Sequence, residues 1–182
     1  MKLHPSLLAL AAAAALAGPA QAIVVVGTTT GAATWNRPLA GAPPTGLSGV
    51  GTAVPYTVLP ITVSTTGSYV FQSTGTTPSN WDNFTVLYQN AFNAATPLVN
   101  ALVANDDNPT IRLSGFTTAL TAGTTYFYIT TGFANTNFGA YSNSITGPGT
   151  ITVVPEPASV ALLGLGLAAV LLRARRREVQ AA

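Results

Sequence analysis

The chain of 182 residues has seven basic and five acidic residues, so 7% of it is charged, against about 25% in an ordinary soluble domain. It has no cysteine, which excludes a disulfide framework, a zinc–thiolate site and a cysteine nucleophile. Between residues 23 and 154 lie only two arginines, against three aspartates. So few cations cannot neutralise a phosphate backbone, and nucleic-acid binding is therefore excluded.

The first 22 residues have the pattern of a secretory signal peptide. Residues 7–16 form an unbroken apolar run, which is too short to span a bilayer. Ala20 and Ala22 give the small-x-small pattern that signal peptidase recognises, so we expect cleavage before Ile23. The only histidine, His4, lies in this segment. The mature chain would therefore lack the usual general base at neutral pH.

Residues 23–154 are expected to form an all-β structure. Threonine supplies 27 of these 132 residues and all the aromatic residues of the chain lie here, and both kinds of side chain suit a pleated, half-buried surface. Without an amphipathic pattern of helix length, this composition favours a single antiparallel β-sandwich or jelly roll over residues 55–154, preceded by an irregular N-terminal arm over residues 23–54. The predicted strands are 56–63, 68–73, 84–88, 98–103, 111–116, 124–131, 141–145 and 150–154.

Short turn and strand motifs between residues 55 and 146 resemble those of a known family. The motifs are, in chain order, Gly67-Ser68-Tyr69, Leu87-Tyr88, Phe92, Pro97-Leu98, Asn105-Asp106-Asp107 and the segment Leu120–Tyr126. Their order is similar to that in the bacterial pre-peptidase C-terminal (PPC-like) domain. The resemblance implies a small, generally non-catalytic β-sandwich of secreted proteins, some of which bind calcium or extracellular polymers.

The acidic residues of the body offer a candidate calcium site. Asp106 and Asp107 lie between two asparagines, and Asp82 precedes them in the chain. Carboxylate and amide oxygens are the ligands that calcium takes, six to eight at a time. The segment lacks the acid spacing of an EF-hand, and the alternative is an ordinary turn, in which Asn and Asp side chains accept bonds from backbone N–H groups. A glycosidase pair formed by Asp82 with one of the others is disfavoured, because no further acid or histidine is present to tune it.

Trp81 is the candidate for stacking on a sugar ring. It stands in a polar stretch just before Asp82, and we expect it to be partly exposed. The alternative is that this side chain fills the interior or packs under a loop, as large aromatic residues usually do.

Residues 155–177 carry a second targeting pattern. The uncharged, apolar segment 158–172 would be about 22 Å long as a helix, short of a hydrocarbon core of about 30 Å, so a buried core helix is an alternative to a transmembrane helix. A cluster of arginines follows, which favours the transmembrane helix with a cytoplasmic stop-transfer flank, because arginine stems can reach the interface. Its members are Arg173, Arg175, Arg176 and Arg177. The triplet before the apolar segment is Pro155, Glu156 and Pro157. Its two prolines cannot continue a strand or a helix, so we expect the triplet to be exposed.

The Pro-Glu-Pro triplet, the apolar segment and the arginine cluster, in this order, resemble the PEP-CTERM sorting signal of Gram-negative bacteria. The resemblance implies recognition by an exosortase, a membrane-embedded cysteine protease that processes the tail near the triplet. Glu156 would then be a recognition residue, and residues 178–182 a short tail. The protein would be anchored in the inner membrane before processing and reach the cell surface or the extracellular space afterwards.

The sequence therefore predicts an exported, non-enzymatic cell-surface or extracellular-matrix protein, structural or adhesive in exopolysaccharide or biofilm. The alternative is a secreted calcium- or carbohydrate-binding module that uses Asp82, Asp106, Asp107 and Trp81. No cofactor is required, although calcium is an option. The expected partners are signal peptidase, exosortase, the inner membrane and extracellular polysaccharide.

Overall fold

Side chains that alternate between two faces define the strands. In β9 (Ala140–Gly147) every second residue is buried, namely Tyr141, Asn143, Ile145 and Gly147, and the residues between them are half-buried. In β4 (Gly67–Thr77) Tyr69, Phe71 and Ser73 are buried in the same way. This period of two is that of a strand with one face on a core.

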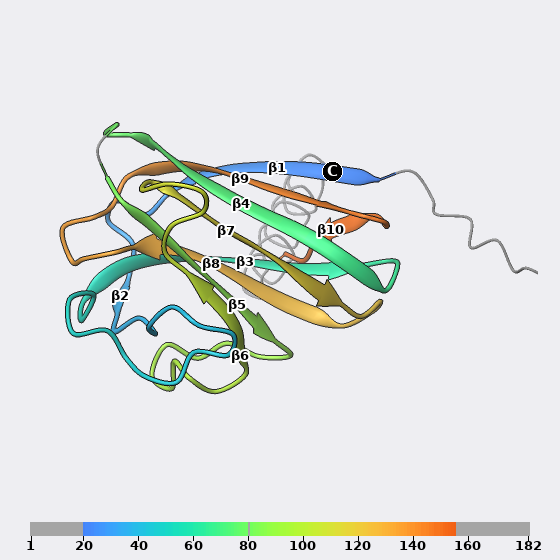
Figure 1. Cartoon of the computed structure of the whole chain (residues 1–182), viewed down its shortest axis with the longest axis horizontal. Coiled ribbons are helices and arrows are strands. Elements are labelled where there is room, and N and C mark those ends of the chain that lie inside the picture. Colours follow the sequence, from blue (N-terminus) through green and yellow to red (C-terminus); the bar gives the residue numbers. More distant parts are fainter. Residues whose placement is uncertain (1–19, 80, 156–182) are drawn as a thin grey trace, which may run out of the picture.

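The computed structural model describes residues 20–79 and 81–155, which form two antiparallel β-sheets packed face to face (Figure 1). The four-stranded sheet has the order β1 (Gln21–Thr28), β9, β4 and β7 (Leu113–Leu120). The six-stranded sheet has the order β10 (Ile151–Val153), β3 (Val54–Val63), β8 (Thr125–Gly132), β5 (Asn83–Gln89) and β6 (Ala101–Asn105), and β2 (Thr34–Trp35) pairs with the start of β3. The predicted all-β sandwich is confirmed, and the two terminal helices that were expected beside it lie outside the described residues.

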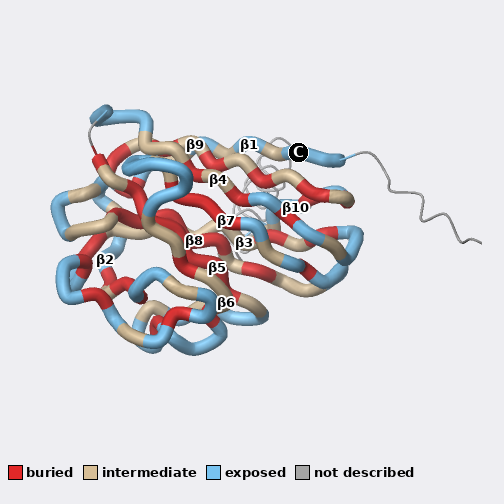
Figure 2. Tube along the Cα trace, in the orientation of Figure 1, coloured by how far each residue is buried: buried red, intermediate tan, exposed pale blue. Residues whose placement is uncertain are grey.

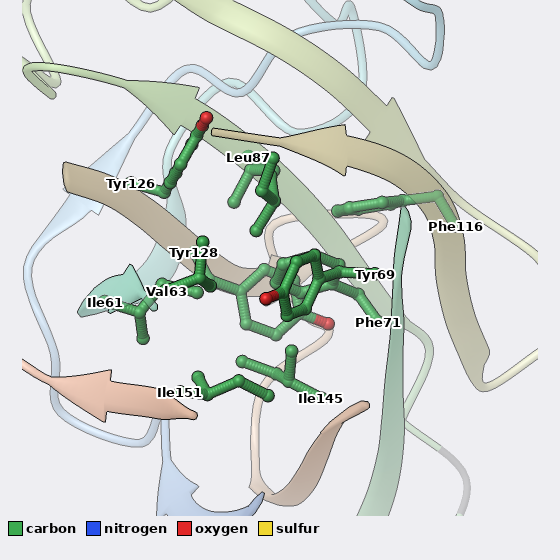
Figure 3. Packing of buried hydrophobic residues seen from close by; sticks show 11 residues of the cluster. Ile61, Val63, Tyr69, Phe71, Leu87, Phe116, Tyr126, Tyr128, Ile145 and Ile151 are labelled. Carbon is green, nitrogen blue, oxygen red and sulfur yellow. The ribbon is translucent and has the colours of Figure 1, made fainter. Parts of the chain in front are cut away.

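The main core lies between the two sheets. Its centre is aromatic. The ring centroid of Phe71 lies 5.1 Å from that of Phe116 and 5.0 Å from that of Tyr128. Figure 3 shows these rings with the aliphatic side chains of both sheets around them. The cluster comprises Ile61, Val63, Tyr69, Phe71, Leu87, Phe116, Leu120, Tyr126, Tyr128, Ile145 and Ile151.

A layer of hydroxyl and amide groups lies beside this core. Asn83 Nδ2 donates to Ser73 Oγ over 2.8 Å, and a 2.7 Å hydrogen bond joins the hydroxyls of Thr85 and Ser114, so both contacts run from one sheet to the other. These bonds satisfy polar groups that would otherwise be costly to bury. They also fix how the two sheets are placed relative to each other.

The arm predicted over residues 23–54 is irregular only in part. Residues 23–28 belong to β1, which pairs along its whole length with β9. The rest covers the outer face of the six-stranded sheet, where Trp35 Nε1 donates to Thr131 Oγ1 over 3.2 Å and Gly41 exchanges two backbone hydrogen bonds with Ala104. The physical reason is that β5 is buried on both faces, so its outer side chains need a cover (Figure 2).

A second cluster lies under this cover and consists of Trp35, Val54, Phe84, Val86, Tyr88, Ala101, Ala104 and Ile129. Two predicted strands are displaced. The segment predicted over 98–103 pairs only from residue 101 on, because turns occupy the residues before it, and the one predicted over 111–116 starts at Leu113 and continues along β4 to Leu120.

Candidate functional site

Strand pairing brings the three acidic residues of the body together. Asp82 directly precedes β5, and Asp106 and Asp107 directly follow β6. Because β5 and β6 are antiparallel and Thr85 pairs with Asn105, the start of one strand and the end of the other meet at the same edge of the sheet. One carboxylate oxygen from each of the three residues lies within 4.8 Å of the others.

Every charged residue between positions 23 and 154 interacts at this corner of the sandwich, which we call the acidic corner. The backbone N–H of Arg112, which directly precedes β7, donates to Asp82 Oδ1 over 3.2 Å. Arg37, from the segment after β2, is close enough to influence the charges of Asp82 and Asp106. The corner therefore combines three negative charges with two positive ones, and the rest of the body is uncharged.

Burial and mutual repulsion make the carboxylates reluctant to ionise. Burial, together with the neighbouring carboxylates of Asp107 and Asp82, raises the pKa of Asp106 to about 6, although Arg37 opposes the shift. The pKa of Asp82 is also raised by burial, against the hydrogen bond from Arg112. Oδ1 of Asp106 is buried and accepts no hydrogen bond from the residues that the structure describes. The site is thus one that a proton or a cation would stabilise.

Three of the five guanidinium N–H groups of Arg37 donate to backbone carbonyls and not to the acids. Nε and Nη2 donate to the carbonyl oxygen of Phe133 over 2.9 and 2.7 Å, and Nη1 donates to that of Pro38 over 2.9 Å. The guanidinium carbon lies 4.0 Å from the ring centroid of Phe84. Arg37 is 2% exposed, and burial lowers its pKa. Sequence reasoning gave Arg37 no role, because its nearness to the acids depends on contacts between distant segments.

The acidic corner has the chemistry of a hard-cation site. Carboxylate oxygens are the ligands that calcium prefers, and the three residues offer three of the six to eight oxygens that it requires. Water and backbone carbonyls would complete the shell. Asp107 is exposed and the other two are half-buried, so the corner is open to solvent on one side.

The structure corrects the prediction for Trp81. This residue is 2% exposed, and its Nε1 donates to the carbonyl oxygen of Ala140 over 2.9 Å. The indole packs against Gly75 and Gly139, where a larger residue would collide with the ring. Trp81 therefore connects β4 to β9 and presents no face on which a sugar could stack.

A second feature, which sequence reasoning missed, is an apolar groove on the outer face of the six-stranded sheet. We call it the β3–β8 groove, and its volume is about 640 Å³. Its rings come from three parts of the chain: Tyr56 on β3, Phe127 on β8 and Phe92 in the loop after β5. The other lining residues are Val58, Pro60, Asn93, Ala94, Thr125, Val154 and Pro155. The sequence feature that could have indicated the groove is the presence of apolar residues on both faces of the predicted strand 124–131. Such a strand has an outer face that other apolar groups contact.

The predicted processing sites lie at the two ends of the described residues. Ala20 and Ala22 are exposed, and Ala22 pairs with Thr146, so cleavage before Ile23 would leave six residues of β1 on β9. Pro155 is the last described residue, while Glu156, Pro157, the apolar segment 158–172 and the arginine cluster lie outside the described part. Among residues 20–79 and 81–155 the structure has no helix of the length and hydropathy needed to cross a membrane.

Comparison with protein families supports the C-terminal assignment. Residues 153–177 match the family model described as the PEP-CTERM protein-sorting motif. The chain therefore carries this sorting motif, which marks it as an exported protein that is anchored in the membrane before an exosortase processes it. No curated protein matches the chain.

Solved structures show only a general likeness. A family 35 carbohydrate-binding module from an environmental isolate is 17% identical, with a TM-score of 0.41 over 73% of this chain and 95% of that one. A CBM35 from Cellvibrio japonicus Abf62 is 13% identical, with a TM-score of 0.36 over 73% and 99%. The Yersinia pseudotuberculosis-derived mitogen is 13% identical, with a TM-score of 0.34 over 69% and 85%. At these scores the likeness says nothing of what this chain binds.

Proposed function

We propose that the mature protein is a non-enzymatic component of the cell surface or the extracellular polysaccharide, in which the sandwich has a structural or adhesive role. The observation that carries the proposal is the direct continuity of the fold with the sorting motif. The motif begins at Val153, the last residue of β10, and the N–H of Val154 donates to the carbonyl oxygen of Pro60 over 2.9 Å. The folded sandwich is therefore the part that sorting delivers.

The surface chemistry supports a role among neutral polymers. Outside the acidic corner the body has no charged residue, and 27 of its 132 residues are threonine. Such a surface offers hydroxyl and amide groups, which exchange hydrogen bonds with water and with sugar hydroxyls alike. Binding of this kind would be weakly dependent on salt, in contrast to binding by charge.

The first experiment tests delivery in the native host. Wild type is compared with a variant in which Pro155, Glu156 and Pro157 are all alanine, by intact mass in the membrane, surface and medium fractions. Wild type should appear at the surface or in the medium without residues 1–22 and without the arginine cluster. The variant should stay in the membrane with the cluster attached. Wild type that keeps Arg173 to Arg177 would contradict sorting.

A second experiment tests the molecular role. Mature protein recovered from the host is sedimented with the host's own extracellular polysaccharide, and the sugar released into solution is measured in parallel. Co-sedimentation without release of sugar is expected. Release of sugar that is lost in Asp82→Asn would instead identify a hydrolase, and absence of co-sedimentation would remove the adhesive role.

The acidic corner favours a second candidate function, a calcium-binding module. Three carboxylates held within 4.8 Å of one another, one of them with a buried oxygen that accepts no hydrogen bond, are the observation behind it. Calcium at 100 times its dissociation constant would stabilise the fold by about 2.7 kcal/mol, which raises the melting temperature of a body of this size by about 10 °C.

The melting temperature is measured in calcium, in magnesium and in a chelator. Calcium alone should raise it, because magnesium requires a strict octahedral shell that an open, partly exposed corner does not supply. The double variant Asp106→Asn, Asp107→Asn should melt at one temperature in all three solutions. Equal melting temperatures of wild type with calcium and with chelator would eliminate the calcium site.

A further inference from the structure

The β3–β8 groove ends where the sorting motif begins. Its lining continues from Tyr56, Val58 and Pro60 on β3 to Val154 and Pro155, which follow β10. Pairing of β10 with β3 and the hydrogen bond from Val154 to Pro60 hold this end of the chain beside the groove. The polypeptide therefore leaves the folded body at the rim of this groove.

The groove is an apolar face that the described residues leave uncovered. The segment after β2 and the loop after β5 cover the outer faces of β5 and β6 and reach the start of β3 at Val54 and Tyr56, and the groove is the part of the β3 and β8 outer faces beyond them. Tyr56, Val58 and Phe127 remain half-buried. Tyr56 also packs against Trp35, with 5.3 Å between the two ring centroids. A contiguous apolar face of this kind marks a surface that another apolar element covers.

We propose that the apolar segment 158–172 of the same chain docks in the β3–β8 groove whenever the segment is not in a membrane. Only Glu156 and Pro157 separate the rim from this segment, which has fifteen residues and no charge. The groove lining is uncharged as well. The inference rests on the sorting motif and adds to it a place for the apolar segment before membrane insertion.

The dimensions agree with this occupant. As a helix the segment would be about 22 Å long. The distance from β10 across β3 to β8, whose outer faces form the groove, is about 10 Å, at about 4.8 Å between neighbouring strands. A helix that starts at the rim therefore reaches across the groove, and the arginine cluster that follows would emerge into solvent on the far side.

Docking would have a consequence for sorting. An exposed apolar segment of fifteen residues promotes aggregation, whereas a docked one is withheld from other chains. A bilayer buries more of the same surface than a groove open on one side, so a membrane should draw the segment out. The groove would thus hold the sorting segment until a membrane receives it.

The absence of cysteine makes the proposal testable by disulfide trapping. The protein used is the chain from Ile23 to its C-terminal residue, which keeps the apolar segment. It carries Ala94→Cys in the groove together with Ala161→Cys or Ala168→Cys in the segment. The matched control replaces Ala94→Cys by Val70→Cys, which lies on the outer face of the other sheet and is 49% exposed. Mild oxidation at high dilution is followed by mass and by gel mobility.

At least one groove pair should form an intramolecular disulfide at least ten times faster than its control, because docking raises the effective concentration of the two thiols. Lipid vesicles should reduce this rate to that of the control, and Val58→Glu should do so without vesicles. Equal rates for groove and control pairs would overturn the proposal. A disulfide formed mainly between two chains would assign the groove to a second copy and overturn it too. Either result would leave the delivery experiment untouched, so the two failures are distinguishable.

Discussion

Replacing Asp106 by asparagine should raise the free energy of unfolding at neutral pH when no divalent cation is present. One carboxylate oxygen of Asp106 lies within 4.8 Å of one from Asp82 and one from Asp107, and its buried Oδ1 accepts no hydrogen bond from the described residues. The substitution removes one of three clustered negative charges and breaks no hydrogen bond of that oxygen. It also keeps the size and shape of the side chain, so packing around it should not change.

The magnitude follows from the raised pKa of Asp106. That pKa is about 6 in the folded protein, against 3.8 for an ordinary aspartate. A carboxyl group with a raised pKa binds its proton more tightly in the folded state, so ionisation lowers stability progressively from pH about 4 to pH about 6. A shift of about 2 units corresponds to about 3 kcal/mol, which solvent screening of this half-buried group reduces to about 1 to 2 kcal/mol.

The assay is urea unfolding of wild type and Asp106→Asn from pH 3.5 to pH 8 in the presence of a chelator. The two proteins should be equally stable at the acidic end, and the variant should gain about 1 to 2 kcal/mol above pH about 6.5, or about 3 to 8 °C in melting temperature. Asp107→Asn is the matched control, because it removes the same charge from an exposed neighbour. It should gain less.

Calcium should reverse the order of the two proteins if the acidic corner binds it, because wild type alone keeps all three carboxylates. A variant that is less stable than wild type at pH 7 in chelator, or a difference that does not change with pH, would refute the reasoning. The carboxylate would then be stabilised by the fold, and the corner would have no deficit of positive charge for a cation to fill.

Three further substitutions test the packing. Trp81→Phe should lower the free energy of unfolding by about 1 to 3 kcal/mol in chemical denaturation, because the carbonyl oxygen of Ala140 loses its donor; an unchanged stability would mean that the bond is made with water instead. Ile145→Ala should cost about 2 to 5 kcal/mol in the same assay, since Ile145 is fully buried between the sheets, and a loss below 1 kcal/mol would contradict the assigned core. Gly147→Ala should lower the melting temperature, because a Cβ there would overlap the ring of Tyr69; a variant as stable as wild type would show that the ring has room to move.

Features that depend on local chemistry were predicted well from sequence. The sorting motif rests on a triplet, an apolar run and a charge cluster that are contiguous in the chain, and the family match covers the same residues. Strand content followed from threonine, aromatic residues and the period of two, as β4 and β9 show. The acidic residues could be named as a candidate set from sequence because residues 23–154 contain no other acids.

Features that depend on pairing between distant segments were decided only by the tertiary structure. Alternation reveals that a strand has two faces, but it does not reveal which loop covers which face. For that reason Trp81 was expected to be partly exposed and residues 23–54 were expected to form an irregular arm, although Trp81 packs between β4 and β9 and the segment after β2 covers β5. The convergence of Asp82 with Asp106 and Asp107 likewise requires the antiparallel register of β5 and β6. The sequence determined which groups exist and where the chain is sent, while the register of the strands determined which groups meet, because hydrogen bonding between strands joins residues that are far apart along the chain.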